Sequence, residues 1–325
     1  MTVMNNTFSR LFAARATSFI FVIIFLLNCN NKPEVQKNIG DDLNNGSKPV
    51  LSLGLAPEIN IFEQKKRYQP LIEYLTEKTG IKIELSVKES YKKVVDHLLD
   101  GTIDIAFVGS LDYVICHSLK KNNNPLCEIL ARPLGLNGIS TYRSYIFARK
   151  ESHITKNVST WKGKKISLVH TMTMAGDTFP RYHLKLNNIN SFDLYFKNVT
   201  YTGSHDATFY SVINKETEIG ACKDLVFHKL IKENPEFEKD LTVLAVSEEV
   251  PSNGLVVSNI VSQEQMALLK ETLLTMHNDQ KGKEILVQFQ TEKFLPTKDS
   301  DYENLYKMIR GLGTTAVDIY KKSVK

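Results

Sequence analysis

A hydroxyl-rich loop between a predicted strand and a predicted helix has the residue types that bind an anion. The strand 164–170 ends at His170, the loop TMTMA follows, and Gly176 begins the helix. The first N–H groups of a helix have no partner within it, and the positive end of the helix dipole lies there. This pattern predicts an anion site, to which the hydroxyls of Thr171 and Thr173 would add donors. Taken singly, each threonine is equally consistent with a plain N-cap.

A histidine at the start of the next predicted helix could supply a further donor. It is His205, in the segment TGSHD, and the alternative is a helix-start residue bonded only to the backbone. A secreted enzyme could use His170, His205, Asp206 and Asp224. However, His205 and Asp206 are adjacent and would diverge on a helix. The motifs Gly-x-Ser-x-Gly, His-Glu-x-x-His and Gly-Lys-Ser/Thr are also absent from the sequence, so we expect no enzyme.

The N-terminal residues have the layout of a secretory signal peptide. Arg10 and Arg15 precede an apolar run at 19–27, which is far shorter than the roughly 20 residues that span a membrane. Cys29 follows directly after LLN, which resembles a bacterial lipobox. The departure is Asn28, since Gly, Ala or Ser is usual before the cysteine. The alternatives, an uncleaved anchor or cleavage elsewhere, also place the rest of the chain outside the cytoplasm.

We therefore predict a lipoprotein signal peptide at 1–28 and a lipidated Cys29. The polar, Asn-rich residues 29–48 have almost nothing to bury and indicate a flexible tether. The folded part is expected to start near Val50. The expected location is the cell envelope, with the lipid holding the protein on the periplasmic or outer side of a bacterial membrane.

The other cysteines indicate neither a zinc site nor a fixed disulfide framework. Cys116, Cys127 and Cys222 are an odd number and cannot all pair within one chain. Cys116 and Cys127 are close enough in sequence for a disulfide, and the alternative is three small buried apolar side chains. No Cys-x-x-Cys or His-x-x-x-His pair occurs. We therefore expect no metal and no cofactor.

Size and charge favour two lobes and argue against nucleic acid as a partner. About 275 residues follow the tether, which is long for one compact core. The chain has 41 Lys and Arg against 36 Asp and Glu, a formal net charge of +5. This excess is scattered along the sequence and forms no basic block, so no nucleic-acid binding is expected.

Strands and helices alternate along the first half of the folded part. Strands are predicted at 50–56, 81–87 and 103–108, with amphipathic helical stripes at 68–75 and 91–99 between them. Gly80 would end the first helix. A strand–helix–strand alternation of this kind favours a parallel sheet covered by helices.

A second α/β unit follows and the chain then becomes helical. Further strands are predicted at 145–149, 164–170, 217–222 and 241–246, and only helical stripes are expected after 255–258. If the C-terminal helices pack on the first unit, lobe 1 comprises 49–143 and 252–325, and lobe 2 comprises 144–251. Two crossings would then join the lobes, with a cleft between them.

Several segments in order resemble the phosphate/phosphite/phosphonate class of ABC-transporter substrate-binding proteins. The segments are RYQPLIEYL (67–75), ESYKKVVDHL (89–98), GTIDIAFVGSLDYV (101–114), TYRSYIFARK (141–150), TWKGKKISLVH (160–170), AGDTFPR (175–181) and TGSHDATFYSVINKETEIGA (202–221). The resemblance implies an α/β fold of the two-lobed type II periplasmic-binding-protein kind, with two crossovers and a ligand cleft between the lobes that closes on a small anion.

The resemblance also implies a set of ligand-binding residues. Tyr91 and Tyr142 match two tyrosines that reach the ligand in phosphonate-binding members, and a phenol offers both a donor and an apolar wall. The alternative for Tyr91 is a residue half buried on its helix face. The complete expected ligand-binding set is Tyr91, Tyr142, Thr171, Thr173, Gly176, Ser204 and His205.

Departures from the family pattern bear on the ligand. Where phosphonate binders show Ser-Thr-Ser-Gly, this chain has TMAG, and His170 replaces the acid that begins the motif. Leu225 and Asn253 stand where aminoalkyl-phosphonate binders carry two acids for the ligand ammonium. Asp224 could substitute for the first of these acids, but it lies one residue before Leu225, and neighbouring side chains on a helix point about 100° apart. The sequence therefore favours a smaller oxyanion or one with an uncharged tail.

We expect a solute-binding lipoprotein that captures a small oxyanion between its lobes and delivers it to an ABC permease. Closure would be a hinge motion at the crossings near Tyr142 and Pro251. A ligand-sensing module that reports to a membrane partner needs the same features. A surface lipoprotein or adhesin that has lost the ancestral ligand is the third possibility, because the anion loop has fewer hydroxyls.

Overall fold

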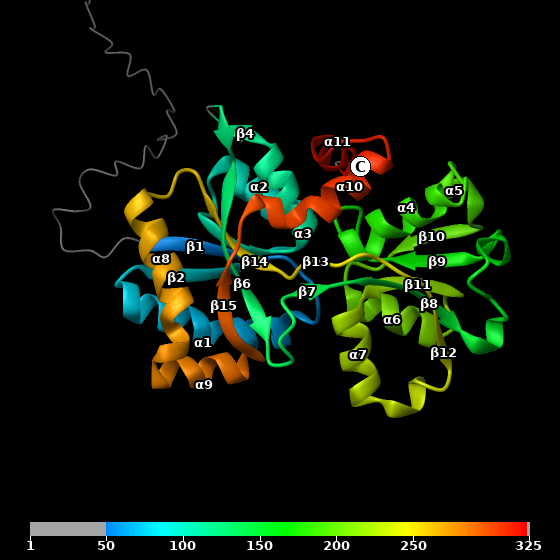
Figure 1. Cartoon of the computed structure of the whole chain (residues 1–325), viewed down its shortest axis with the longest axis horizontal. Coiled ribbons are helices and arrows are strands. Elements are labelled where there is room, and N and C mark those ends of the chain that lie inside the picture. Colours follow the sequence, from blue (N-terminus) through cyan, green and yellow to red (C-terminus); the bar gives the residue numbers. More distant parts are fainter. Residues whose placement is uncertain (1–49, 122, 324–325) are drawn as a thin grey trace, which may run out of the picture.

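Two β-sheets, one in each lobe, organise the part of the chain that the computed structural model describes, residues 50–121 and 123–323 (Figure 1). The expected signal peptide, the lipidated Cys29 and the tether lie outside these residues. No helix within the described ranges is long and apolar enough to cross a membrane.

The sheet of the first lobe has six strands in the order β15-β6-β14-β3-β1-β2. The strands are β1 (Val50–Leu55), β2 (Lys82–Val87), β3 (Ile105–Val108), β6 (Cys127–Gly135), β14 (Gly254–Ser258) and β15 (Thr291–Pro296). β1 pairs in parallel with β2 and β3, as the sequence predicts. The sheet continues beyond these three strands with β14, β6 and β15, which add antiparallel pairs that the sequence did not predict.

Helices cover both faces of this sheet. They are α1 (Ile61–Thr79), α2 (Tyr91–Asp100), α3 (Ser110–Ser118), α8 (Gln263–Thr275) and α9 (Gln280–Gln288). The predicted stripe of α1 is buried, and the helix ends at Gly80, whose φ of 71° is left-handed. α1, α8 and α9 share one apolar core, whereas α2 and α3 pack into another on the opposite face (Figure 1). This arrangement leaves the starts of α2 and α3 facing the second lobe.

The sheet of the second lobe has five strands in the order β10-β9-β11-β8-β12. The strands are β8 (Ser144–Arg149), β9 (Lys165–Leu168), β10 (Asn198–Tyr201), β11 (Ile219–Lys223) and β12 (Leu241–Val246). The helices are α4 (Phe179–Leu186), α5 (Phe192–Tyr195), α6 (His205–Ile213) and α7 (Asp224–Glu233). A short π-helix, Met174–Thr178, precedes α4, so the helix predicted from about Gly176 starts slightly earlier.

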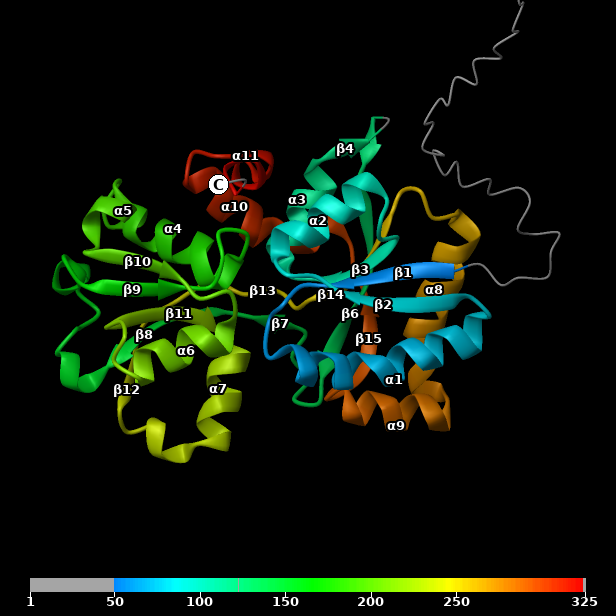
Figure 2. The same ribbon diagram turned by 180° about the vertical axis from the view of Figure 1, so that it is seen from behind.

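Two short strands carry the chain between the lobes. β7 (Thr141–Tyr142) and β13 (Val250–Pro251) pair in antiparallel fashion, with Tyr142 opposite Val250. Both lie between the two sheets in Figures 1 and 2. The fold is thus the two-lobed type II architecture that the sequence predicts.

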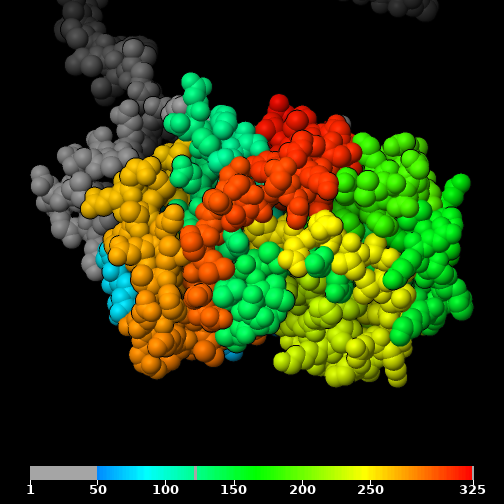
Figure 3. All heavy atoms as spheres, viewed as in Figure 1, coloured from blue at the N-terminus to red at the C-terminus, as the bar shows by residue number. Residues whose placement is uncertain are grey.

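The last two helices touch both lobes. α10 (Glu303–Gly311) packs on α3 and on α4, and α11 (Ala316–Lys322) packs on α3. Figure 3 shows them lying across the junction between the lobes. The assignment of all of 252–325 to lobe 1 therefore stays a prediction. A small hairpin, β4 (Lys120–Lys121) and β5 (Asn124–Pro125), follows α3.

The three cysteines of the described ranges are buried free thiols rather than a disulfide. A hydrogen bond with Cys127 raises the pKa of Cys116 well above its usual value, so the Cys116 thiol stays protonated. Residues 50–121 and 123–323 contain no cluster of three or more His, Cys, Asp or Glu that could hold a metal ion.

Candidate functional site

A small cavity lies where the two lobes meet. Its volume is about 10 Å³, which is the space of roughly one water molecule. Both lobes and the β7 crossing contribute to its wall. The lining residues are Glu58, Tyr91, Gly109, Ser110, Leu111, Asp112, Tyr142, Met172, Thr173, Met174, Ala175, His205 and Lys223.

Helix starts surround the cavity. Tyr91 begins α2, Ser110 begins α3 and His205 begins α6, while Met174 begins the π-helix. Each start leaves backbone N–H groups that have no acceptor within the helix, and each carries the positive end of a helix dipole. The fold therefore creates a positive potential at the cavity before any charged side chain is considered.

Three buried polar atoms of the lining have no hydrogen-bond partner within the described residues. They are Tyr91 Oη, Asp112 Oδ1 and His205 Nε2. The three side chains are only 2%, 1% and 1% exposed. An unpartnered polar atom at this depth costs free energy. Three of them around one cavity indicate that a polar molecule completes the site.

His205 is a neutral imidazole whose remaining donor belongs to the cavity. Burial, together with the nearby Lys223 ammonium, lowers the pKa of His205 to about 3. The backbone N–H of Lys223 donates to His205 Nδ1, with 3.2 Å between the nitrogens. Nδ1 is thus the acceptor of the ring, and a neutral imidazole then carries its proton on Nε2. His205 offers this N–H to the cavity.

Tyr91 and Asp112 add two further polar groups whose pKa values are raised. Burial raises the pKa of the Tyr91 phenol well above 10, so its O–H stays a donor. Burial, followed by the charge of Glu58, raises the pKa of Asp112 well above 3.8. A protonated carboxyl can both donate and accept a hydrogen bond. The cavity therefore faces a ligand with donors from the first lobe and from the second.

A buried ion pair spans the cleft beside these groups. Lys223 Nζ lies 2.5 Å from Glu58 Oε1 and donates to Asn253 Oδ1 at 2.6 Å. Nζ also lies 4.7 Å from the centre of the Tyr142 ring. Burial alone would raise the pKa of Glu58, but the Lys223 ammonium outweighs this and holds the pKa below 4.5.

Comparison with known proteins identifies the family. The model of a family described as "ABC transporter, phosphonate, periplasmic substrate-binding protein" matches residues 53–302. The chain belongs to this family. Its members are substrate-binding components of transporters rather than enzymes, and the periplasmic description places the chain outside the cytoplasm.

Curated relatives and a solved structure agree with this assignment. The phosphate-import protein PhnD of Mycolicibacterium smegmatis is 24% identical over 219 residues, which is 66% of each chain. The probable ABC transporter phosphite-binding protein PhnD1 of Prochlorococcus marinus is 21% identical over 279 residues, 81% of this chain and 90% of that one. A structure of PhnD1 from P. marinus in complex with methylphosphonate shares the fold, with a TM-score of 0.70, 20% identity and coverage of 81% of this chain and 98% of that chain.

Four of the residues that the family resemblance predicts lie at the cavity. They are Tyr91, Tyr142, Thr173 and His205. The hydroxyl of Tyr142 lies 3.1 Å from Ser110 Oγ, so Tyr142 is anchored at its far end. The hydroxyl of Thr173 donates to the carbonyl oxygen of His170 at 2.7 Å. That hydroxyl therefore shapes the loop rather than pointing a free donor at the cavity.

His170 holds the anion loop against Tyr91. Its ring stacks on the Tyr91 ring, with centroids 5.4 Å apart and 29° between the planes. Its Nδ1 accepts a hydrogen bond from the backbone N–H of Met172 at 3.1 Å. The histidine that replaces the usual acid of the family motif thus fixes two parts of the lining, one from each lobe.

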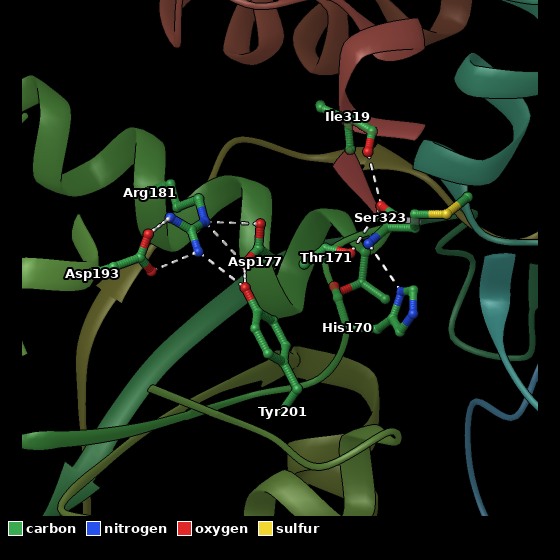
Figure 4. A network of polar contacts seen from close by, with 10 residues as sticks. His170, Thr171, Asp177, Arg181, Asp193, Tyr201, Ile319 and Ser323 are labelled. Atoms are coloured by element: carbon green, nitrogen blue, oxygen red, sulfur yellow. Dashed lines mark hydrogen bonds and ion pairs between the residues drawn. The ribbon is translucent and has the colours of Figure 1, made fainter. Parts of the chain in front are cut away.

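The other three predicted residues do not line the cavity. Thr171 points to the C-terminal segment, where its hydroxyl lies 2.9 Å from Ser323 Oγ (Figure 4). Ser204 caps α6 by accepting from the backbone N–H of Ala207. Gly176 packs against Val169, where an added Cβ would lie 2.5 Å from Val169 Cβ. Their expected contacts with a ligand therefore stay predictions.

A charged network behind the anion loop secures the π-helix. Asp177 is 5% exposed, and Arg181 Nε donates to its carboxylate at 3.0 Å. Tyr201 donates to the same carboxylate at 2.7 Å, and Arg181 also pairs with Asp193 (Figure 4). The network keeps the first turn of the helix in place.

Sequence reasoning missed Glu58, Asp112 and Lys223. Glu58 lies two residues after the predicted strand 50–56, and Lys223 directly follows the predicted strand 217–222. These positions at strand ends are the only signal that could have found the two residues. Asp224, considered earlier as a substitute acid, accepts instead from the backbone N–H of Arg143 at 3.0 Å. Neither Asp224 nor Leu225 lines the cavity.

Proposed function

We propose that the protein is an extracytoplasmic solute-binding lipoprotein of an ABC importer, anchored through Cys29. It binds a small oxyanion of the phosphate, phosphite or phosphonate kind between its lobes and hands it to the membrane permease. The observation that carries this proposal is the convergence of three unpartnered atoms, Tyr91 Oη, Asp112 Oδ1 and His205 Nε2, on one cavity between the lobes.

The chemistry of these groups matches an oxyanion. The Nε2–H of His205 and the O–H of Tyr91 are donors, and burial with the charge of Glu58 raises the pKa of Asp112 and so favours its protonated, donating form. A phosphonate offers oxygen acceptors in a tetrahedral arrangement, and hydrogen bonds to a charged acceptor are about twice as strong as neutral ones. The surrounding helix starts add a favourable potential for an anion.

Binding would require the lobes to part. A cavity of about 10 Å³ is too small for a phosphonate. The two crossings, β7 and β13, are the short segments about which such a hinge motion would occur. The proposed cycle is therefore opening, capture of the oxyanion, closure over it and delivery to the permease.

One observation favours the second candidate function. This candidate is either a ligand-sensing module, or a surface lipoprotein or adhesin that has lost the ancestral ligand. The Lys223–Glu58 ion pair joins the lobes directly, and the cavity beside it has a volume of only about 10 Å³. Import and sensing both need closure, whereas a purely adhesive protein needs only the closed shape.

Titration calorimetry on the full chain in detergent tests the proposal. Methylphosphonate, phosphite, phosphate and sulfate are the ligands, and at least one phosphorus oxyanion is expected to bind. Tyr91→Phe and His205→Gln should each weaken binding by about tenfold, because each removes or displaces one donor to a charged acceptor. Absence of binding for all four ligands would overturn the proposal and favour the adhesive alternative.

Two matched variants control for general damage. Tyr68→Phe changes a buried tyrosine on α1, and His183→Gln changes a histidine whose Nε2 is also buried and unpartnered. Neither residue lines the cavity. Both variants should therefore bind the oxyanion with unchanged affinity.

A further inference from the structure

The ammonium of Lys223 is enclosed by three groups from other segments. Glu58 Oε1 and Asn253 Oδ1 lie 2.5 and 2.6 Å from Nζ, and the face of the Tyr142 ring lies 4.7 Å away. The Lys223 side chain is only 9% exposed. A carboxylate, an amide oxygen and an aromatic face are the groups that bind an alkylammonium ion.

We propose that Glu58, Asn253 and Tyr142 form a cation subsite of the ligand cleft and that Lys223 occupies it as an internal cation. Lys223 thereby excludes oxyanions that carry their own ammonium group and selects those with a neutral tail or none. The oxyanion part of this inference rests on the function proposed above, whereas the cation subsite stands on the contacts of Lys223 alone.

The cation subsite and the oxyanion donors belong to one site. Lys223 and His205 line the same cavity, and the backbone N–H of Lys223 fixes the His205 ring through Nδ1. An oxyanion held at His205 Nε2 would lie in the cavity that Lys223 also lines, so an ammonium on its tail would need the subsite that Lys223 fills. The two cations would compete for the same three partners.

Charge balance gives the same result. Glu58 and Lys223 neutralise each other, so a second ammonium beside Lys223 would find no free carboxylate to pair with in a largely buried place. Burial and the charge of Glu58 raise the pKa of Asp112 well above 3.8, which disfavours a second anion beside this pair. Removal of the Lys223 ammonium would leave Glu58 buried and free to attract the ammonium of a ligand.

The first test compares two ligands on the full chain by titration calorimetry. Methylphosphonate and aminomethylphosphonate differ by one ammonium group. The natural protein should bind methylphosphonate at least about tenfold more tightly, and Lys223→Ala should reverse this preference by about tenfold or more. Tight binding of aminomethylphosphonate by the natural protein, or an unchanged preference in the variant, would overturn the inference while methylphosphonate binding upheld the proposed function.

Lys229→Ala is the matched control. Lys229 Nζ pairs with Glu63 Oε2 at 3.1 Å, also between the lobes, but this pair is exposed and lies outside the cavity. Its loss removes one inter-lobe lysine–glutamate pair without opening the cation subsite. The ligand preference of Lys229→Ala should therefore equal that of the natural protein.

The second test needs no oxyanion. Ethylammonium at about ten times its dissociation constant should raise the melting temperature of Lys223→Ala by about 3 °C, and leave the natural protein and Lys229→Ala unchanged. If Lys223→Ala is unfolded alone, ethylammonium should restore its circular dichroism signal. The double variant Glu58→Gln/Lys223→Ala should not respond, because its subsite lacks the carboxylate.

The two tests separate the two proposals. If ethylammonium raises the melting temperature of Lys223→Ala but no phosphorus oxyanion binds to the natural protein, the cation subsite is supported and the proposed function is overturned. Suppose instead that the natural protein binds a phosphorus oxyanion, but Lys223→Ala neither responds to ethylammonium nor binds aminomethylphosphonate more tightly. This result overturns the cation subsite alone.

Discussion

The backbone N–H of His205 donates to the carbonyl oxygen of Glu58, with 3.1 Å between nitrogen and oxygen. Glu58 lies in the loop after β1 and His205 begins α6, so this bond joins the lobes beside the cavity, where Figure 2 shows the two segments approaching each other. The side chain of Glu58 binds Lys223, and the backbone of Lys223 binds the His205 ring. A change in one of these residues therefore alters the surroundings of the other two.

Glu58→Gln should destabilise the closed protein. The substitution leaves the Lys223 ammonium buried without its counter-charge, and breaking a buried pair in this way costs about 3 kcal/mol. Urea unfolding at pH 7 measures the change. Glu63→Gln is the control, because its pair with Lys229 is 60% and 39% exposed and should be worth less than about 1 kcal/mol. Equal losses in the two variants would show that the Glu58–Lys223 pair is not closed in solution.

Asp112→Asn should stabilise the protein at neutral pH. Because burial and Glu58 raise the native pKa of Asp112 above 3.8, the native state holds a proton that the unfolded chain releases. The contribution of this residue to the free energy of unfolding therefore falls as pH rises above 3.8. Asn keeps the shape of the neutral acid without this loss, so the variant should be more stable than the natural protein in urea unfolding at pH 7.

Asp104→Asn provides the contrast for this prediction. Asp104 is also buried, but its carboxylate accepts the backbone N–H of Ser52 at 2.8 Å. Hydrogen bonds to a charged group contribute about 1.5–3 kcal/mol, so this variant should lose stability at pH 7. Loss of stability in Asp112→Asn as well would indicate that Asp112 is ionised in the native state.

The hydrophobic pattern of the sequence was sufficient for most of the fold. The predicted strand 103–108 is apolar except for Asp104, and the crossings followed from the order of the two α/β units. β6 and β15 escaped prediction because their apolar pattern is weak. Pro133 interrupts β6, and β15 has only Phe294 and Leu295 between polar residues and a terminal proline. These segments form strands because neighbouring strands pair with them, and not because of their own residue pattern.

The site was predictable only where a local motif carried it. His205 and Thr173 belong to recognisable helix starts and loops, and both line the cavity. Glu58 and Lys223 are 165 residues apart in sequence and acquire a role only when the lobes meet. A single lysine after a strand has no local property that distinguishes a buried ion pair from a solvated charge.

Two buried histidines should each lower the stability as the pH drops from 7 to 5, a contribution opposite in sign to that of Asp112. Burial lowers the pKa of His205 to about 3 and that of His170 to about 4, against 6.5 in the unfolded chain. Below pH 6.5 these histidines become protonated in the unfolded chain but stay neutral in the native state. Each histidine therefore lowers the free energy of unfolding by about 1.4 kcal/mol for each unit by which the pH falls. Urea unfolding at several pH values gives the slope.

His170→Phe should reduce the slope of the free energy of unfolding against pH by the contribution of one histidine. The aromatic ring keeps the stacking on Tyr91 but cannot be protonated. The measurement stays above pH 5, because the lowered pKa of Glu58 means that its own stabilisation is lost only as pH falls below about 4.5. A slope identical to that of the natural protein would show that His170 is protonated in the native state and therefore exposed.

Gly176→Ala should lose about 1–3 kcal/mol, because the core around the π-helix has no space for a methyl group. The added Cβ would lie 2.5 Å from Val169 Cβ and 2.8 Å from Thr173 Oγ1. Val169→Gly in the same chain removes this Cβ together with the Cγ atoms, so the double variant should be more stable than the sum of the two single losses by at least about 0.5 kcal/mol. Urea unfolding of the three variants measures this coupling. Strict additivity would mean that Gly176 is required by the backbone of the anion loop and not by its contact with Val169.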